Sequence, residues 1–186
     1  MDESQCRAFL AKHGISVQEW GKGGAKTLNH LIAELSATEA ELSARDGLVV
    51  RRIRIARVSV CYIVGGKKLL LREQKQVFKD GRERIRRHLG SSISEKIRKG
   101  ENPEEVARRA IQEELGINEY LRLSSNGIIY VPLSPSRSFP GLLTENSIYV
   151  FCVHLLEKHY NPNGYIEEQH DKSTYFVWED FPSLPQ

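Results

Sequence analysis

Acidic residues are concentrated in one short segment, residues 95–117, with the sequence EKIRKGENPEEVARRAIQEELGI. Glu113 and Glu114 are adjacent near its end, and Ala110 precedes them by about one helical turn. Carboxylate oxygens are ligands for hard cations such as Mg²⁺, which keeps several waters and also binds substrate phosphates. The segment therefore predicts a site for metal and phosphate in which position 110 contributes no carboxylate.

A helix is predicted to position these acids. Asn102 can cap this helix, Pro103 suits its first turn, and Gly116 ends it. At about 100° per residue, Glu114 falls inside an apolar arc of the helix and Glu113 lies at the edge of that arc. Because burying unpaired charge is costly, we expect a cation to compensate these carboxylates. The apolar arc comprises Val106, Ala107, Ala110, Ile111 and Leu115.

This spacing resembles the Nudix box, a signature of hydrolases that cleave pyrophosphate links. Two positions depart from the box: Glu95 stands in place of its leading glycine, and Ala110 replaces the glutamate of its Arg-Glu pair. In the family that glutamate is a principal metal ligand or the general base. The departure at position 110 therefore puts hydrolysis in question more than it does the fold. The alternative to a Nudix box is that this segment is an ordinary amphipathic surface helix. The matching residues are Glu101, Arg109, Ile111, Glu113, Glu114, Gly116 and Ile117.

The resemblance implies a divalent cation, Mg²⁺ or Mn²⁺, held by Glu113, Glu114 and Glu101, with Arg109 supporting the acidic cluster. Residues 164–172, GYIEEQHDK, form a predicted loop rich in acids. Related hydrolases place a base or an extra metal ligand in a loop beyond the box. An ordinary acidic turn is the alternative. The candidate bases are Glu167, Glu168 and Asp171.

Basic residues precede the box and would meet substrate phosphates, because arginine chelates phosphate oxygens. A solvated loop is the alternative for each of them. Residues 138–151 are similar to a segment of ADP-ribose-type pyrophosphatases, which implies that Phe139 stacks on a base. A turn at Pro140-Gly141 is the alternative there. The candidate substrate-binding residues are Arg84, Arg86, Arg87, Lys96, Arg137, Phe139 and Glu145.

The composition fits one α/β domain: 186 residues, of which 40% are hydrophobic and 27% are charged. A net charge of +3 argues against a nucleic-acid binder. No membrane span or secretory signal is visible, and Cys6, Cys61 and Cys152 lack paired metal spacing, so we expect a cytoplasmic or nuclear protein. The expected partner is a nucleotide-like phosphorylated small molecule, and a homodimer is compatible with the sequence.

Two regions are predicted along the chain. Residues 4–45 are predicted to be helical and give an N-terminal helical extension, residues 1–47. Residues 48–186 are predicted to form a Nudix-like α/β/α sandwich with a mixed β-sheet, which the resemblance implies more than the pattern does. Alternating apolar residues predict a strand from Leu48. The other predicted strands are residues 68–74, returning after a Gly65-Gly66 turn, and residues 127–133, 147–155 and 175–178.

Three functions are compatible with these features. The first is a metal-dependent hydrolase of a nucleoside diphosphate linked to another group, similar to ADP-ribose, with catalysis weakened or relocated because of Ala110. The second is a catalytically inactive Nudix domain that binds a nucleotide or a protein. The third, with the least support, is a basic module that recognises nucleic acid through residues 79–99.

Overall fold

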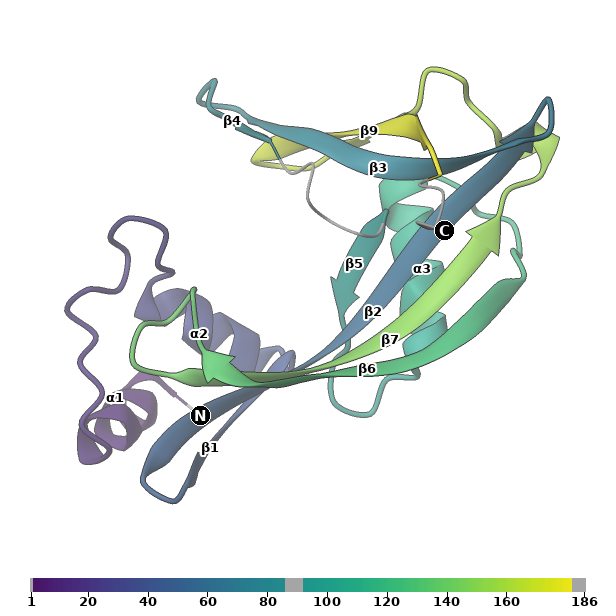
Figure 1. Cartoon of the computed structure of the whole chain (residues 1–186). Coiled ribbons are helices and arrows are strands. Elements are labelled where there is room, and N and C mark those ends of the chain that lie inside the picture. The colour runs from purple at the N-terminus through teal and green to yellow at the C-terminus, as the bar shows by residue number, and fades with distance from the viewer. Residues whose placement is uncertain (1, 86–91, 182–186) are drawn as a thin grey trace. The chain divides into compact units, whose positions relative to one another are not determined.

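The computed structural model describes residues 2–85 and 92–181, which fold as two compact units (Figure 1). Both units draw on separate stretches of the sequence, so neither coincides with a single continuous segment. Within the described part of the chain, no helix combines the length and the apolar character that a membrane crossing needs. Among the described residues, unit 1 comprises 2–55, 96–101 and 128–148, and unit 2 comprises 56–85, 92–95, 102–127 and 149–181.

The described strands pair in the order β6-β7-β2-β3-β9-β8, with β1 and β5 also paired to β2 and β4 paired to β3. The predicted hairpin is confirmed, because β2 and β3 are antiparallel from Cys61↔Leu70 to Val64↔Lys67. The other three predicted strands correspond to β6, β7 and β9. The strands are β1 Ala40–Arg45, β2 Leu48–Val64, β3 Lys67–Phe78, β4 Glu83–Ile85, β5 Ile93–Lys96, β6 Leu123–Pro135, β7 Leu143–His154, β8 Tyr165–Glu168 and β9 Lys172–Asp180.

The helical prediction for residues 4–45 is correct for α1 (Glu3–Lys12) and α2 (Leu28–Ser36) but wrong for residues 40–45. Those residues form β1, which pairs antiparallel with the start of β2. The turn between the two strands is Asp46-Gly47, and both residues have positive φ, 51° and 78°. Such a turn matches the right-handed twist of paired strands. Pairing with a long neighbouring strand therefore overrides the weak helical preference of this segment.

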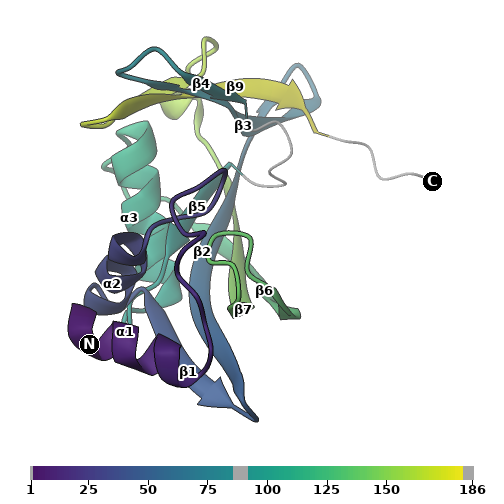
Figure 2. The ribbon, with the colours of Figure 1, turned by 90° about the vertical axis from the view of Figure 1, so that its left-hand side faces the viewer.

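Apolar side chains from both helices form the core of unit 1. Figure 2 shows α1 and α2 side by side, and Leu10 of α1 and Leu31 of α2 are almost fully buried. Trp20 lies in the segment between the helices, and its ring is tilted against that of Phe139 with 5.1 Å between centroids. The indole of Trp20 also donates a hydrogen bond to the carbonyl oxygen of Pro140. This core ties the N-terminal helices to the segment that follows β6.

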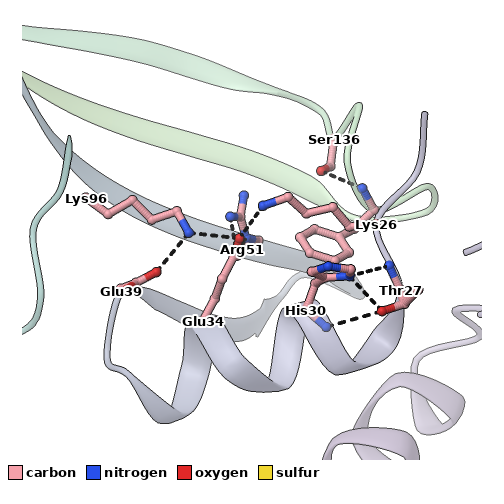
Figure 3. A network of polar contacts seen from close by, with 9 residues as sticks. Lys26, Thr27, His30, Glu34, Glu39, Arg51, Lys96 and Ser136 are labelled. Carbon is pink, nitrogen blue, oxygen red and sulfur yellow. Dashed lines mark hydrogen bonds and ion pairs between the residues drawn. The ribbon is translucent and has the colours of Figure 1, made fainter. Parts of the chain in front are cut away.

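A buried carboxylate, that of Glu34 on α2, is compensated by three cations (Figure 3). It accepts hydrogen bonds from Lys26 Nζ at 2.8 Å, Arg51 Nε at 2.9 Å and Lys96 Nζ at 3.0 Å. Lys96 also contacts Glu39 at 2.9 Å. Burial alone would raise the pKa of the Glu34 carboxyl, but the bond from Lys26 and the charges of Arg51 and Lys96 lower it to about 2.

Replacing Glu34 by Gln is expected to lower the free energy of unfolding by about 3 kcal/mol at pH 7, because the cations lose the charge that compensates them. Urea denaturation measures this change. The matched control is Glu19→Gln. Glu19 forms an exposed ion pair with Lys22, with 3.1 Å between Oε1 and Nζ. The control should change stability by less than about 1 kcal/mol. Equal losses in the two variants would contradict the prediction.

The contribution of Glu34 should also depend on pH. The folded-state pKa of about 2 lies below the ordinary value of 4.5, so the stabilisation is complete above pH 4.5 and is lost as pH falls toward 2. The difference in unfolding free energy between the natural chain and Glu34→Gln should therefore shrink over that range. Urea denaturation at several pH values tests this, and a constant difference would show that the charge of Glu34 is not what stabilises the fold.

Candidate active site

The acidic segment forms the predicted helix, α3 (Pro103–Leu115). The side chain of Asn102 caps it by accepting a hydrogen bond from the Glu104 N–H at 2.8 Å. Gly116 ends it in the left-handed conformation, with φ 67°, and donates its N–H to the carbonyl of Gln112. The predicted apolar arc is confirmed. Its buried residues are Val106, Ala107, Ala110, Ile111 and Leu115.

Glu114 of α3 lines a polar cavity of about 170 Å³ in unit 2, which we call the acidic cavity. Three further carboxylates line it, those of Glu73 on β3, Glu95 on β5 and Glu167 on β8. Lys172 is the one basic side chain among the described lining residues, so negative charge is in excess. The remaining lining residues are Gln76, Ser92, Ser94, Gln169 and Thr174.

The excess of negative charge acts directly on Glu114. Burial, together with the charges of the Glu167, Glu95 and Glu73 carboxylates, raises the pKa of its carboxyl to about 9, and the charge of Lys172 opposes the rise. The carboxyl is therefore protonated at neutral pH unless a cation compensates it. A divalent cation beside Glu114 would reverse this preference by favouring the charged form.

The acidic cavity offers the chemistry that a hard cation requires, because carboxylate, amide and hydroxyl oxygens are its preferred ligands. Thr174 is only 3% exposed, and its Oγ1 has no hydrogen-bond partner among the described residues. Within residues 2–85 and 92–181, however, no three Asp, Glu, His or Cys side chains come close enough together to hold an ion as they stand. The side chains that line the cavity are of the types that bind a hard cation. Cation binding would require them to move closer together.

The other residues predicted to bind metal do not share the cavity with Glu114. Glu113 is exposed and points toward Arg109, with 4.0 Å between Oε1 and Nε. Glu101 belongs to unit 1, where its carboxylate accepts a hydrogen bond from the N–H of Arg98 at 2.7 Å. Adjacent helical positions point about 100° apart, which explains why Glu113 and Glu114 diverge.

The acidic loop predicted at residues 164–172 is in part a strand: residues 165–168 form β8, and residues 169–171 are the turn that leads to β9. Strands β8 and β9 pair antiparallel from Tyr165↔Phe176 to Glu168↔Ser173. Gly164 permits the close approach, since a Cβ there would lie 1.9 Å from the carbonyl oxygen of Phe176. The ladder of backbone hydrogen bonds holds these residues in extended form.

The three candidate bases therefore have different surroundings. Glu167 lines the acidic cavity. Glu168 accepts a hydrogen bond from the hydroxyl of Ser173 at 2.6 Å. Asp171 is exposed in the turn of the hairpin, and its carbonyl oxygen accepts a hydrogen bond from the N–H of Lys79. Of the three, only Glu167 shares the cavity with Glu114 among the described lining residues.

The expectation that Phe139 stacks on a base is wrong, because Phe139 is fully buried in the core of unit 1. The Arg51 guanidinium lies 5.0 Å from the centroid of its ring, so the ring face is already covered. The apolar surface of an aromatic ring favours burial wherever the fold provides a core. Arg137, two residues earlier, is exposed.

None of the remaining substrate-binding candidates that the structure describes lines the acidic cavity. Lys96 is engaged with Glu34 and Glu39. Glu145 accepts a hydrogen bond from Arg52 Nε at 2.7 Å and lines a different cavity, of about 220 Å³, in unit 1. Arg84 is exposed on β4. Arg86 and Arg87 lie outside the described residues.

Sequence reasoning missed most residues of the cavity, among them Glu73, Glu95 and Thr174. Glu95 carries a signal in the sequence, because it departs from the glycine of the box that its segment resembles. Glu73 and Thr174 lie on β3 and β9, which pair with one another across a register shift between Glu73 and Lys75. A β-bulge of this kind changes the direction in which the neighbouring side chains point. The position of the bulge depends on pairing between strands that are far apart in the sequence.

The chain matches a protein-family model over most of its length. The family model of the NUDIX domain matches residues 54–185. A comparison with curated protein sequences gave no match. Similar solved structures include the Ap4A hydrolase of C. elegans, which is 14% identical, with 69% of this chain and 80% of that chain covered and a TM-score of 0.38.

Two further solved structures have similar scores. DR0079 from Deinococcus radiodurans is 17% identical, with 68% of this chain and 65% of that chain covered and a TM-score of 0.41. The NUDIX domain of Shewanella oneidensis NrtR, complexed with ADP ribose, is 9% identical, with coverage of 69% and 73% and a TM-score of 0.38. The family model covers more than half of the chain, including α3 and the acidic cavity. The chain therefore belongs to the Nudix family.

Proposed function

We propose that the chain hydrolyses the pyrophosphate link of a nucleoside diphosphate joined to another group, with Mg²⁺ or Mn²⁺ bound at the acidic cavity. Membership of the Nudix family implies pyrophosphate chemistry in general. The observation that carries the proposal is Glu114. It lies on the family's signature helix and lines a cavity with three further carboxylates. Excess buried negative charge of this kind is compensated when a hard cation binds.

Glu114 and the other cavity carboxylates would hold the cation. When bound, a divalent cation would polarise a phosphoryl group of the substrate and lower the pKa of the water molecule that attacks its phosphorus atom. Glu167 is the best placed of the three candidate bases to take the proton of that water, because it lines the same cavity. Lys172, at the same cavity, would pair with an anionic oxygen of the substrate.

The second candidate function is a Nudix domain that binds a nucleotide or a protein without cleaving it. Ala110 favours this function, because its side chain is 1% exposed and packs in the apolar face of α3. The helix therefore contributes Glu114 alone to the described lining of the cavity. The two functions differ in whether the purified chain turns over its ligand.

The natural chain, given Mg²⁺ or Mn²⁺, is expected to hydrolyse at least one member of a panel of ADP-ribose, dinucleotides, diphosphoinositol phosphates and capped RNA. Turnover should be slower than about 10 s⁻¹, since one central carboxylate is missing. Glu114→Gln should lower the rate by about 10- to 100-fold. Phosphate or nucleotide release, followed by chromatography, measures both.

The matched control is Glu105→Gln, because Glu105 is exposed on the same helix and does not line the acidic cavity. Its rate should equal that of the natural chain. If no compound in the panel is cleaved in a metal-dependent reaction, the hydrolase proposal is wrong, whether or not the compounds bind. Binding without cleavage would then support the second function.

Stability without metal should depend on the ionisation of Glu114. The folded-state pKa of about 9 lies above the ordinary value of 4.5, so the contribution of Glu114 to stability is greatest below pH 4.5 and is lost as pH rises through about 9. In a chelator, Glu114→Gln should flatten this decline, because an amide does not ionise. Thermal unfolding between pH 5 and 9 measures it, and parallel profiles for the two proteins would contradict the pKa shift.

A further inference from the structure

The helix that carries Glu114 does not place a second carboxylate in the acidic cavity. Ala110 lies about one turn before Glu114, on the buried face of α3, and is 1% exposed. It is not among the described residues that line the cavity. A cation at Glu114 must therefore take its other ligands from elements outside α3.

Glu95 lines the cavity from β5. The start of β5 is fixed by buried contacts. Ile93 is 1% exposed, and the hydroxyl of Ser92 donates to the carbonyl of Leu71 at 2.6 Å and accepts from the N–H of Val60 at 2.9 Å. The backbone that carries Glu95 is thus well anchored.

A second observation indicates that the cavity is built for a ligand. Thr174, which also lines it, is 3% exposed, and its Oγ1 has no hydrogen-bond partner in the described part of the chain. A buried hydroxyl without a partner costs free energy unless water or a ligand satisfies it. A bound cation with its water shell would supply that partner.

The two departures of this chain from the Nudix box differ in their relation to this cavity. Position 110 carries no carboxylate, whereas position 95 carries one that lines the cavity. We propose that Glu95 is a cation ligand that replaces the carboxylate missing at position 110. This inference rests on the proposed function, since it takes Glu114 as the ligand on the helix.

The test is Mn²⁺ binding by the full-length chain, measured by electron paramagnetic resonance and by calorimetry. Glu95→Gln is expected to weaken Mn²⁺ binding by about tenfold or more. Removing a residue that only hydrogen-bonds to a metal ligand already weakens metal binding by about that factor, and removing a ligand itself should weaken it at least as much. Ala110→Glu, added to Glu95→Gln, is expected to restore it. Restored Mn²⁺ binding in the double variant would show that Glu95→Gln removes a ligand and does not unfold the chain. The control variant, Glu105→Gln, should bind Mn²⁺ as tightly as the natural chain does.

The outcomes separate this inference from the proposed function. If Glu114→Gln abolishes Mn²⁺ binding while Glu95→Gln binds as tightly as the natural chain, Glu95 is not a ligand and the proposed function stands. If the natural chain binds no Mn²⁺, both proposals are overturned. If both single variants weaken binding and Ala110→Glu rescues Glu95→Gln, the replacement is supported.

Discussion

In unit 1 the carboxylate of Glu34 is buried, and the surrounding elements are arranged so that three cations compensate it. Lys26 reaches it from the segment before α2, Arg51 from β2 and Lys96 from the end of β5. These segments are distant in sequence, so one buried charge joins them. Leaving such a charge unpaired would cost several kcal/mol, which makes the compensation a requirement of the fold.

Unit 2 places a half-buried carboxylate in the opposite environment. Glu114 is surrounded by three other carboxylates and one lysine, so the protein does not compensate it. An uncompensated acid lowers stability, and positions of this kind are concentrated at functional sites. The pKa of Glu34 is lowered and that of Glu114 is raised. The fold itself compensates the charge of Glu34, whereas the charge of Glu114 would be compensated by a bound cation.

Local patterns predicted much of the fold. The cap, stop and apolar face of α3 follow from residues within about four turns of one another, as does the hairpin at Gly65-Gly66. Some segments whose structure depends on strand pairing or on core packing were predicted wrongly. Residues 40–45 are a strand because β2 pairs with them, and residues 165–168 are a strand because β9 pairs with them. Phe139 is in the core because Trp20 and Arg51 cover its ring.

The sequence by itself determined the family resemblance, the helix that carries the acids and the inward direction of Glu114, because helical periodicity is local. Tertiary structure alone decided which carboxylates share a cavity with Glu114, since Glu73, Glu95 and Glu167 come from three strands. It also decided that Cys61 and Cys152, isolated in the sequence, bring their Sγ atoms to 3.9 Å. Side chains far apart along the chain meet only through strand pairing and register, which no local pattern encodes.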